Sequence, residues 1–427
     1  MHEQPIHIGT RDSFGAETPV FLRPEDRRAH TYIVGKTGTG KSSLLKNIIQ
    51  QDLAAGRGVA LIDPHGDLAE SLLDAIPRHR IGDVTYFNAG DTEFPVAWNI
   101  LSTAAGDNPA LIASGVVAAF KAIWRDSWGP RLEYLLYAAV ASLLECQNVS
   151  LLGVSRILSD RNYRRSIVKR VTDPGLKLFW QNEFERYDER FLREAIAPVQ
   201  NKVGQLLLAP HVRHIFGQVT SRINIRFIMD NRRIFIVNLA KGRIGEDKAN
   251  LLGALLVSAF QTAAMGRASV PESKREDFHL VIDEFQNFTT DSFTSILSEA
   301  RKYRLNLTVA HQYIDQMPEE VRAAVFGNIG TMITLRVGEH DAALLAREYG
   351  ASVVPEHFTD LPNYQALVRP VAINTQDEPY RANLQGPRDP QGNRRATIER
   401  RSRERFATPV ETVKRRLQRW LGTSFHG

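Results

Sequence analysis

A glycine-rich segment, GKTGTGKS, has the composition and spacing of a phosphate-binding loop. Its Gly35, Gly40, Lys41 and Ser42 fit the pattern G-x-x-x-x-G-K-[ST]. The glycines let successive backbone N–H groups surround phosphate oxygens, and the helix that follows adds the positive end of its dipole. Lys41 would reach the terminal phosphates, and the Ser42 hydroxyl would hold Mg²⁺. The predicted loop residues are Gly35, Lys36, Thr37, Gly38, Thr39, Gly40, Lys41, Ser42 and Ser43.

Two acids follow a second apolar run, FHLVIDEF. This run predicts a strand that brings Asp283 and Glu284 to its carboxyl end, the edge at which open α/β sheets bind ligands. Asp283 is suited to hold the Mg²⁺ shell through water, and Glu284 to polarise an attacking water. Two acids after a strand can also cap a loop. Their pairing with the Lys41 loop favours a hydrolytic site.

Further polar residues come downstream of these acids. A helix that starts near Thr290 ends close to Arg301 and Arg304, and the next predicted strand ends at His311 and Gln312. Gln312, at the tip of that strand, would sense the terminal phosphate, while Arg301 would reach the nucleotide of a neighbouring subunit. Arginines at the end of a helix are also favoured by the helix dipole, so a purely structural role stays open, more for Arg304 than for Arg301.

The elements that must position these residues alternate between strands and helices. The order from residue 30 to residue 63 is strand, glycine loop, helix, strand, which opens a parallel α/β domain. Further strands are expected at 232–240, 278–283, 305–310 and 331–337, and a long helix at 250–266. Residues 99–225 show amphipathic helical periodicity instead. The expected fold is an α/β, RecA-like P-loop NTPase with a parallel-rich central sheet and an inserted all-helical domain.

These patterns divide the chain into four expected parts. They are an N-terminal hairpin (1–28), a RecA-like ATPase domain (29–98 and 226–375), a helical insertion domain (99–225) and a basic C-terminal tail (376–427). The net charge of +6 comes from the tail, because residues 381–427 hold 12 Lys and Arg against 4 Asp and Glu. Such a segment either contacts nucleic acid or an acidic membrane surface, or is a solvated tail.

Composition excludes several classes of protein. With 427 residues and 43% apolar side chains, the chain is long enough for two or three folded units and is not disordered. A single cysteine, Cys146, excludes intramolecular disulfides and cysteine-rich metal clusters, which indicates a reducing compartment. No uninterrupted apolar run reaches the roughly 18 residues of a membrane span. We therefore expect no integral membrane segment and a cytoplasmic location.

Several motifs together resemble the FtsK/HerA class of ring-forming ATPases. Within that class, the sequence is most similar to the conjugative coupling proteins of type IV secretion and their soluble TraG/TraD-like relatives. The segments that carry the resemblance are the glycine loop, LIDPHGD (61–67), WGPR (128–131), NKVGQLL (201–207), LAKGRIGED (239–247), IDEFQNF (282–288) and AHQY (310–313).

The resemblance implies a function and a role for each site residue. It implies ATP and Mg²⁺ as cofactors, Lys41 and Ser42 as their contacts, and Asp283 and Glu284 as the hydrolytic acids. It implies that Gln312 senses phosphate and that Arg301 acts on the adjacent subunit. The implied assembly is a homo-oligomer, a hexameric ring that pumps DNA through its channel without reading sequence.

The resemblance also implies partners and a location. A relaxase or a secretion-channel protein would be the protein partner, and the chain would lie in the cytoplasm or peripherally at the inner face of the membrane. Membrane-bound coupling proteins carry N-terminal spans, whereas this sequence begins close to the motor.

Two other functions fit the same motifs. One is an ATPase that handles or exports a protein cargo, for which the helical insertion and the tail would bind polypeptide. Stimulation of hydrolysis by nucleic acid separates it from the DNA pump. The other is a nucleotide switch without motor activity, which Glu284 argues against, since a switch can work with very slow hydrolysis.

Overall fold

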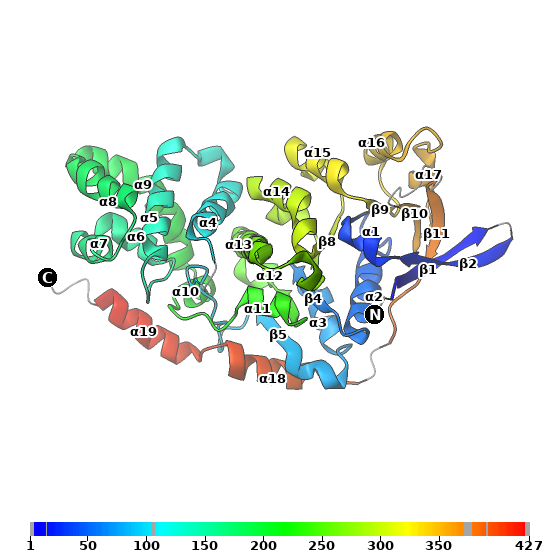
Figure 1. Ribbon diagram of the computed structural model, residues 1–427, viewed down its shortest axis with the longest axis horizontal. Coiled ribbons are helices and arrows are strands. Elements are labelled where there is room, and N and C mark those ends of the chain that lie inside the picture. Colours follow the sequence, from blue (N-terminus) through cyan, green and yellow to red (C-terminus); the bar gives the residue numbers. More distant parts are fainter. Residues whose placement is uncertain (1–3, 14, 104–106, 371–377, 390–391, 423–427) are drawn as a thin grey trace. The chain divides into compact units, whose positions relative to one another are not determined.

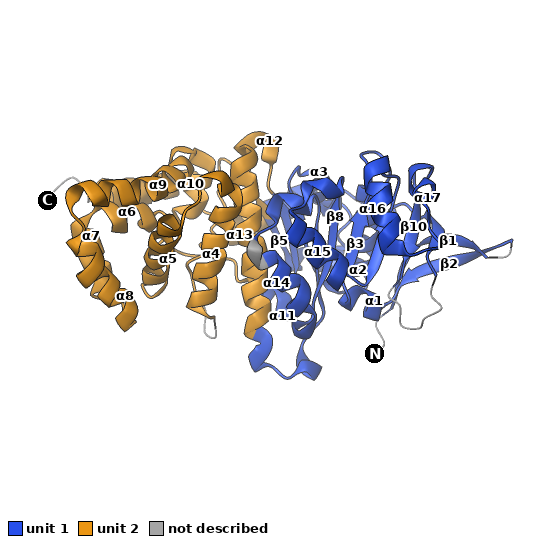
Figure 2. Cartoon of the chain, turned by 90° about the horizontal axis from the view of Figure 1, so that it is seen from above, with its two compact units in different colours: residues 1–86, 226–238, 267–399 blue, residues 87–225, 239–266, 400–427 orange. Residues whose placement is uncertain are grey.

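The computed structural model describes residues 4–13, 15–103, 107–370, 378–389 and 392–422. These residues form two compact units, which are coloured separately in Figure 2. Unit 1 comprises residues 1–86, 226–238 and 267–399, and unit 2 comprises 87–225, 239–266 and 400–427. The division falls inside four elements, β5, α11, α18 and the 3-10 turn η5 (Gly266–Ser269).

An eleven-stranded sheet, with the order β2-β1-β11-β10-β9-β3-β8-β7-β4-β6-β5, forms the centre of unit 1. Its strands are β1 (Ile6–Ser13), β2 (Ala16–Leu22), β3 (Thr31–Val34), β4 (Gly58–Asp63), β5 (Val84–Asn88), β6 (Ile234–Asn238), β7 (Phe278–Ile282), β8 (Leu305–His311), β9 (Thr331–Thr334), β10 (Gln365–Arg369) and β11 (Tyr380–Leu384). From β9 to β6 the neighbouring strands run parallel, and from β2 to β9 they run antiparallel. The expected α/β fold with a parallel-rich sheet is confirmed.

The parallel strands are buried along their whole length, as strands with helices on both faces must be. This explains why their sequences are continuous apolar runs. The helices of unit 1, seen beside the sheet in Figure 1, are α1 (Pro24–Arg28), α2 (Lys41–Ala54), α3 (Asp67–Leu73), α11 (Ile225–Asp230), α14 (Asp291–Glu299), α15 (Glu319–Asn328), α16 (Glu339–Tyr349) and α17 (Glu356–Thr359).

Unit 2 is helical. Its helices are α4 (Pro109–Ile123), α5 (Pro130–Leu144), α6 (Gly153–Ser159), α7 (Arg161–Val168), α8 (Pro174–Leu178), α9 (Glu189–Leu208), α10 (Pro210–Phe216), α12 (Lys241–Ile244), α13 (Glu246–Met265), α19 (Val410–Gly422) and the larger part of α18 (Arg395–Phe406). The helical unit is therefore larger than the expected insertion at 99–225. Residues 239–266 belong to it because α13 packs against α4 instead of covering the sheet.

Among the residues that the structure describes, one helix is long and apolar enough to cross a membrane by length and composition. It is Glu246–Ser269, which includes α13, and 67% of its most apolar window is buried inside the protein. Most residues of α13 are buried, which accounts for its apolar character, as in the central helix of a helical bundle.

The hairpin expected at residues 1–28 is present as β1 and β2, but it is not a separate part. β1 also pairs with β11, so that Gly9 lies opposite Leu384 and the hairpin extends the sheet of unit 1. Ile6 and Ile8 are buried in the same apolar core as the phosphate-loop strand. The sequence did not show this pairing, because β11 is short, includes Arg381 and Asn383, and is far away along the chain.

The basic segment expected as a tail, 376–427, is folded over the residues that the structure describes. β11 joins the sheet of unit 1, and Ile398 at the start of α18 lies in its core. In unit 2, α19 packs against α10 and buries Val413 and Leu417. The expected helix at 410–421 is therefore confirmed as α19. Several apolar side chains of this segment, such as Ile398, Val413 and Leu417, face inward, and most of its arginines are exposed.

Replacement of Leu417 tests whether α19 is part of the folded unit. Leu417 is 6% exposed, whereas Leu421 on the same helix is 50% exposed. We expect Leu417→Ala to lower the free energy of unfolding by about 2–4 kcal/mol, since a buried leucine is lost and a cavity remains. Leu421→Ala is the matched control and should change it by less than about 0.5 kcal/mol. Urea unfolding measures both, and equal effects would mean that α19 is not anchored.

Candidate active site

The loop between β3 and α2 has a backbone suited to surrounding a phosphate. Gly38 and Gly40 have φ angles of 79° and 117°, in the left-handed region that favours glycine. Thr39 is buried, and its hydroxyl donates a hydrogen bond to the carbonyl of Lys36 at 2.7 Å. Lys36 and Gly38 are exposed. The loop is therefore held from inside by Thr39, while its outer residues remain accessible to a ligand.

Lys41, the first residue of α2, directs its ammonium group into this loop. Nζ donates to the carbonyl of Gly35 at 2.5 Å and to that of Lys36 at 3.3 Å. Burial lowers the pKa of Lys41, and the nearby carboxylates of Glu284 and Asp283 act in the opposite direction. The ammonium is thus held by carbonyl oxygens that a phosphate oxygen can replace.

Three acids stand at the carboxyl ends of the two adjacent parallel strands β4 and β7. Asp63 ends β4, and Asp283 and Glu284 follow β7. Burial raises the pKa of Asp283 to about 7, and the negative charges of Glu284 and Asp63 add to this effect. Asp63 already accepts backbone N–H bonds from His65 and Ala69, at 2.9 Å each, so it caps the start of α3. Of these acids, Asp283 is therefore the one whose negative charge a bound cation would stabilise most.

Gln312 connects the acids to the glycine loop. It follows β8, and its amide donates to Glu284 at 2.7 Å, while its carbonyl accepts from the hydroxyl of Thr37 at 2.9 Å. The other carboxylate oxygen of Glu284 accepts from Gln286 at 2.8 Å. Glu284 itself has φ 47° and ψ 49°, a left-handed conformation that costs energy for a residue other than glycine. A change at the loop would therefore reach Glu284 through a single amide.

The described residues contain no group of three or more His, Cys, Asp or Glu side chains able to hold a metal ion by themselves. This suits Mg²⁺, which proteins hold through one or two oxygen side chains while phosphate and water complete the shell. Ser42, exposed in the first turn of α2, and the buried Asp283 are the side chains that would supply these oxygens. Ser43, the next residue, is half-buried.

The structure places Arg301 away from this site. Arg301 lies in the 3-10 turn η8 (Ala300–Tyr303), which precedes β8. The parallel strands β3 and β8 align Val34 with His311, so the glycine loop and Gln312 share the carboxyl edge of the sheet. Arg301 is at the amino edge, where its charge helps to lower the pKa of the buried His30. Within its own chain it does not meet Lys41 or the acids.

Arg301 and Arg304 differ in what their guanidinium groups contact. Arg301 is exposed, and within the part of the chain that the structure describes its guanidinium has no hydrogen bond or ion pair. Arg304 forms a hydrogen bond with Glu272 at 3.3 Å and lies 3.9 Å from Asp277. A neighbouring molecule would therefore find Arg301 free and Arg304 engaged.

Tyr364 contacts the loop and was not singled out from the sequence. Its backbone N–H donates to the carbonyl of Thr39 at 2.9 Å, and its ring is so close to Gly40 that a side chain there would meet it at 2.9 Å. The ring is 52% exposed, and φ is 63°. No local signal reveals this contact, because it depends on β10 lying two strands away from the loop strand.

Two family models match the chain, each around one half of the site. "Helicase HerA, central domain" matches residues 6–102, which include the glycine loop. "TraM recognition site of TraD and TraG" matches residues 277–351, which include the acids, Arg301 and Gln312. A comparison with curated protein sequences finds no significant match.

Solved structures share the fold at low sequence identity. The "bacterial conjugative coupling protein TrwBdeltaN70" in its unbound form has a TM-score of 0.62 at 15% identity, over 90% of this chain and 91% of that one. The "plasmid coupling protein TrwB in complex with ADP and Mg2+" has a TM-score of 0.64 at 15% identity, over 92% and 97%. VirB4 of Thermoanaerobacter pseudethanolicus has a TM-score of 0.56 at 14% identity, over 89% and 96%.

The raised pKa of Asp283 predicts that its charge destabilises the ligand-free protein. The pKa in the folded state, about 7, lies above the ordinary 3.8, so stability is lost as the pH rises through 7. We expect Asp283→Asn to raise the melting temperature at pH 8 without metal or nucleotide, and this gain to vanish near pH 4. At about 1.4 kcal/mol per pKa unit, the gain is at most a few kcal/mol.

Asp277 provides a control of opposite sign. Burial opposes its ionisation, but hydrogen bonds from Arg28 and Asn306 outweigh burial and lower its pKa overall. Asp277→Asn should therefore lower the melting temperature at pH 8. A loss of stability at pH 8 in both variants would contradict the raised pKa of Asp283.

Proposed function

We propose that this chain is a Mg²⁺-dependent ATPase that moves DNA as a ring. The two family models support this proposal, because they confirm the resemblance to the FtsK/HerA class and its conjugative coupling proteins. The observation that carries the proposal is the meeting of Lys41, Asp283, Glu284 and Gln312 at one edge of the sheet of unit 1. ATP and Mg²⁺ are the ligands that suit this set. A structural relative is described as a complex with ADP and Mg²⁺.

Each residue of the site has a distinct role in hydrolysis. Lys41 exchanges its two loop carbonyls for phosphate oxygens and neutralises their charge. Ser42 and Asp283 hold Mg²⁺, which would polarise the phosphate oxygens. Glu284 orients and deprotonates the attacking water. The exposed ring of Tyr364 lies beside Gly40, where it would flank a nucleotide whose phosphates are bound by the loop.

Gln312 couples the state of the phosphate to the acid. Because it binds both Thr37 and Glu284, loss of the terminal phosphate at the loop would change the hydrogen bonds of the catalytic carboxylate. Such a make-and-break contact can bias a two-state motion of the subunit. Arg301, exposed on the opposite edge, would complete the site of a neighbouring copy, which makes hydrolysis a property of the assembled ring.

DNA is the proposed cargo. The C-terminal segment presents arginines on the outer faces of α18 and α19 in unit 2, and Arg401, Arg416 and Arg419 are exposed there without a hydrogen bond or ion pair among the described residues. Such charges bind phosphates without reading sequence. The proposal includes a hexameric ring in the cytoplasm, at the inner face of the membrane where a relaxase or a channel protein would meet it. A protein cargo is the alternative.

Substitutions in the site test the ATPase activity. We expect Lys41→Ala to lower turnover at least about 100-fold, because the other lysine of the loop, Lys36, is exposed and its ammonium lies near Gly338 instead of inside the loop. Glu284→Gln should lower it by about 10²–10⁴ while ATP remains bound, since the amide keeps the shape but cannot accept a proton. Lys46→Ala, on the same helix, is the control. ATPase assays with duplex DNA, single-stranded DNA and no polymer measure these effects.

Near-parental turnover of Lys41→Ala would reject the site. Hydrolysis that no form of DNA stimulates would favour the protein-handling ATPase instead.

Charge-removing substitutions test the DNA surface. Since the C-terminal segment is folded, we expect replacement of Arg401, Arg416 and Arg419 by Gln to keep the fold and the polymer-free ATPase activity. The slope of log affinity against log salt should fall by up to about 2.7, at about 0.9 for each phosphate contact. Replacement of the same residues by Lys keeps the charge and should keep the slope. An unchanged slope in the Gln variant would assign this surface to a protein or membrane partner.

A further inference from the structure

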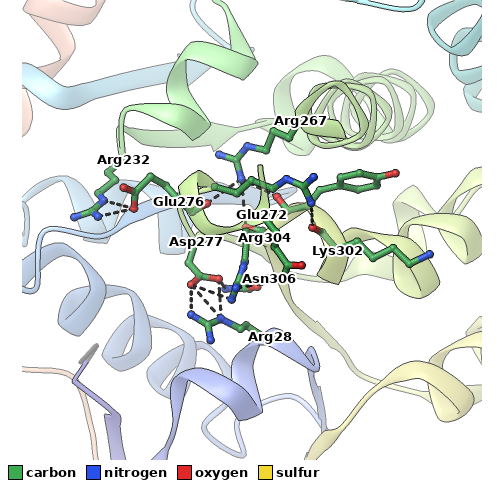
Figure 3. Close-up of polar contacts among 11 residues, drawn as sticks. Arg28, Arg232, Arg267, Glu272, Glu276, Asp277, Lys302, Arg304 and Asn306 are labelled. Atoms are coloured by element: carbon green, nitrogen blue, oxygen red, sulfur yellow. Dashed lines mark hydrogen bonds and ion pairs between the residues drawn. The ribbon is translucent and has the colours of Figure 1, made fainter. Parts of the chain in front are cut away.

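The backbone that follows Arg301 is held by two other arginines. Arg267 is 1% exposed, and its guanidinium donates to the carbonyl of Tyr303 at 2.9 Å and to that of Arg304 at 3.5 Å. Arg275 donates to the carbonyl of Lys302. The three residues after Arg301 are thus each fixed through their carbonyl oxygens. Figure 3 shows these contacts around Arg267, Lys302 and Arg304.

Both arginines are themselves anchored in unit 1. Arg267 donates to Asp230 at 2.8 Å and to the carbonyl of Glu276 at 2.9 Å. Arg275 donates to the carbonyl of Val270 at 2.8 Å, and its guanidinium lies 5.6 Å from the centre of the Tyr303 ring. The chain from η8 into β8 is therefore tied to the segment that leads into β7.

Arg304 closes the turn at its other end. It has φ 58°, in the left-handed region, and its carbonyl accepts from the N–H of Phe278 at the start of β7, at 2.9 Å. Its guanidinium faces Asp277, which Arg28 and Asn306 also bind (Figure 3). This set of contacts leaves η8 few ways to move.

The distribution of contacts along the turn is uneven. The carbonyl groups after Arg301 and the side chain of Arg304 are all bound, whereas the guanidinium of Arg301 is exposed and binds nothing among the described residues. Carbonyl groups at the end of a helix need hydrogen-bond partners, and here two arginines supply them. A cation that acts on the nucleotide of a neighbouring subunit needs a fixed position, because a misplacement of about 1 Å can cost 100-fold in rate. A rigid turn with one free guanidinium provides this.

We propose that Arg267 and Arg275 form a clamp that positions Arg301 for the triphosphate bound to a second copy of this chain. The clamp residues act through the backbone and touch no substrate. The inference rests on the proposed function, since it requires that Arg301 acts on a neighbouring subunit.

Arg275 is the residue to replace, because it is half-buried and its loss leaves Arg267 in the core. Arg275→Met keeps the apolar stem and removes the donors to Val270 and Lys302. We expect turnover to fall about 10- to 100-fold, with the KM for ATP changed less than about twofold, since the variant's own nucleotide site is intact. Arg275→Lys keeps at most one of the two carbonyl contacts and should give intermediate turnover.

Arg232→Met is the matched control. Arg232 lies on the same edge and pairs with Glu276, and among the described residues its side chain forms no hydrogen bond or ion pair with residues 302–304 (Figure 3). Its loss should leave turnover unchanged.

Mixed rings separate positioning from a general structural defect. Lys41→Ala chains lack a nucleotide site but carry an intact Arg301. Mixed with Arg275→Met chains, they should restore partial activity, because some interfaces then pair an intact site with a correctly placed Arg301. Arg275→Met mixed with Arg301→Ala should restore none. Copurification of two tags confirms that the rings are mixed.

The outcomes distinguish failure of the inference from failure of the proposed function. If Arg301→Ala mixed with Lys41→Ala recovers no activity, Arg301 does not act across an interface. Both the clamp and the proposed completion of the site by a neighbouring subunit are then rejected. If the Arg301→Ala and Lys41→Ala mixture recovers activity, two further results would reject the clamp alone. One is parental turnover of Arg275→Met, and the other is an inactive Arg275→Met that mixing with Lys41→Ala does not rescue. If Arg275→Met does not fold, parental turnover of Arg275→Lys rejects the clamp.

Discussion

Charge at the carboxyl edge of the sheet is the constraint on which the site of unit 1 depends. Parallel strands end at one edge, so β4 and β7 bring Asp63, Asp283 and Glu284 together there. Lys41 is the cation that offsets them, and in the ligand-free chain it is bound by loop carbonyls. The pKa of Asp283 is raised because it is buried and because the other two acids are negatively charged. A ligand that brings both phosphate and a divalent cation would give Lys41 an anionic partner and would neutralise the charge of the clustered acids.

The opposite edge of the same sheet is organised by cations instead of acids. At the starts of β7 and β8, arginine side chains bind carbonyl oxygens and the buried Asp277, and few charges are left without a partner. The two edges are thus complementary in composition. An edge that would bind phosphate and an edge that presents the Arg301 guanidinium, unpaired among the described residues, are the two halves that adjacent copies of one chain would need under the proposed function.

Local patterns predicted the part of the fold that holds the site. Predominantly apolar runs gave the parallel strands β3, β4, β6, β7, β8 and β9 within a few residues, because strands buried on both faces hold few polar side chains, such as His279 and Asn306. The structure then brought Lys41, Asp283, Glu284 and Gln312 to one edge, as their positions after these strands predicted. Long-range pairings were not predictable: β11 in the sheet, α13 on α4 and Tyr364 on the loop depend on distant partners that leave no local periodicity.

The pairing of β1 with β11 has a consequence for how the protein is made. Gly9 and Thr10 lie opposite Leu384 and Asn383, so β1 leaves the ribosome long before β11, the strand with which it pairs, and has to wait for it. At about 5–20 residues per second, that wait is on the order of tens of seconds. During it, β1 has only β2 as a partner, and its other edge is open to strands of nearby nascent chains. Completion of the sheet therefore requires synthesis through β11, and a chain truncated before residue 380 would keep that edge exposed.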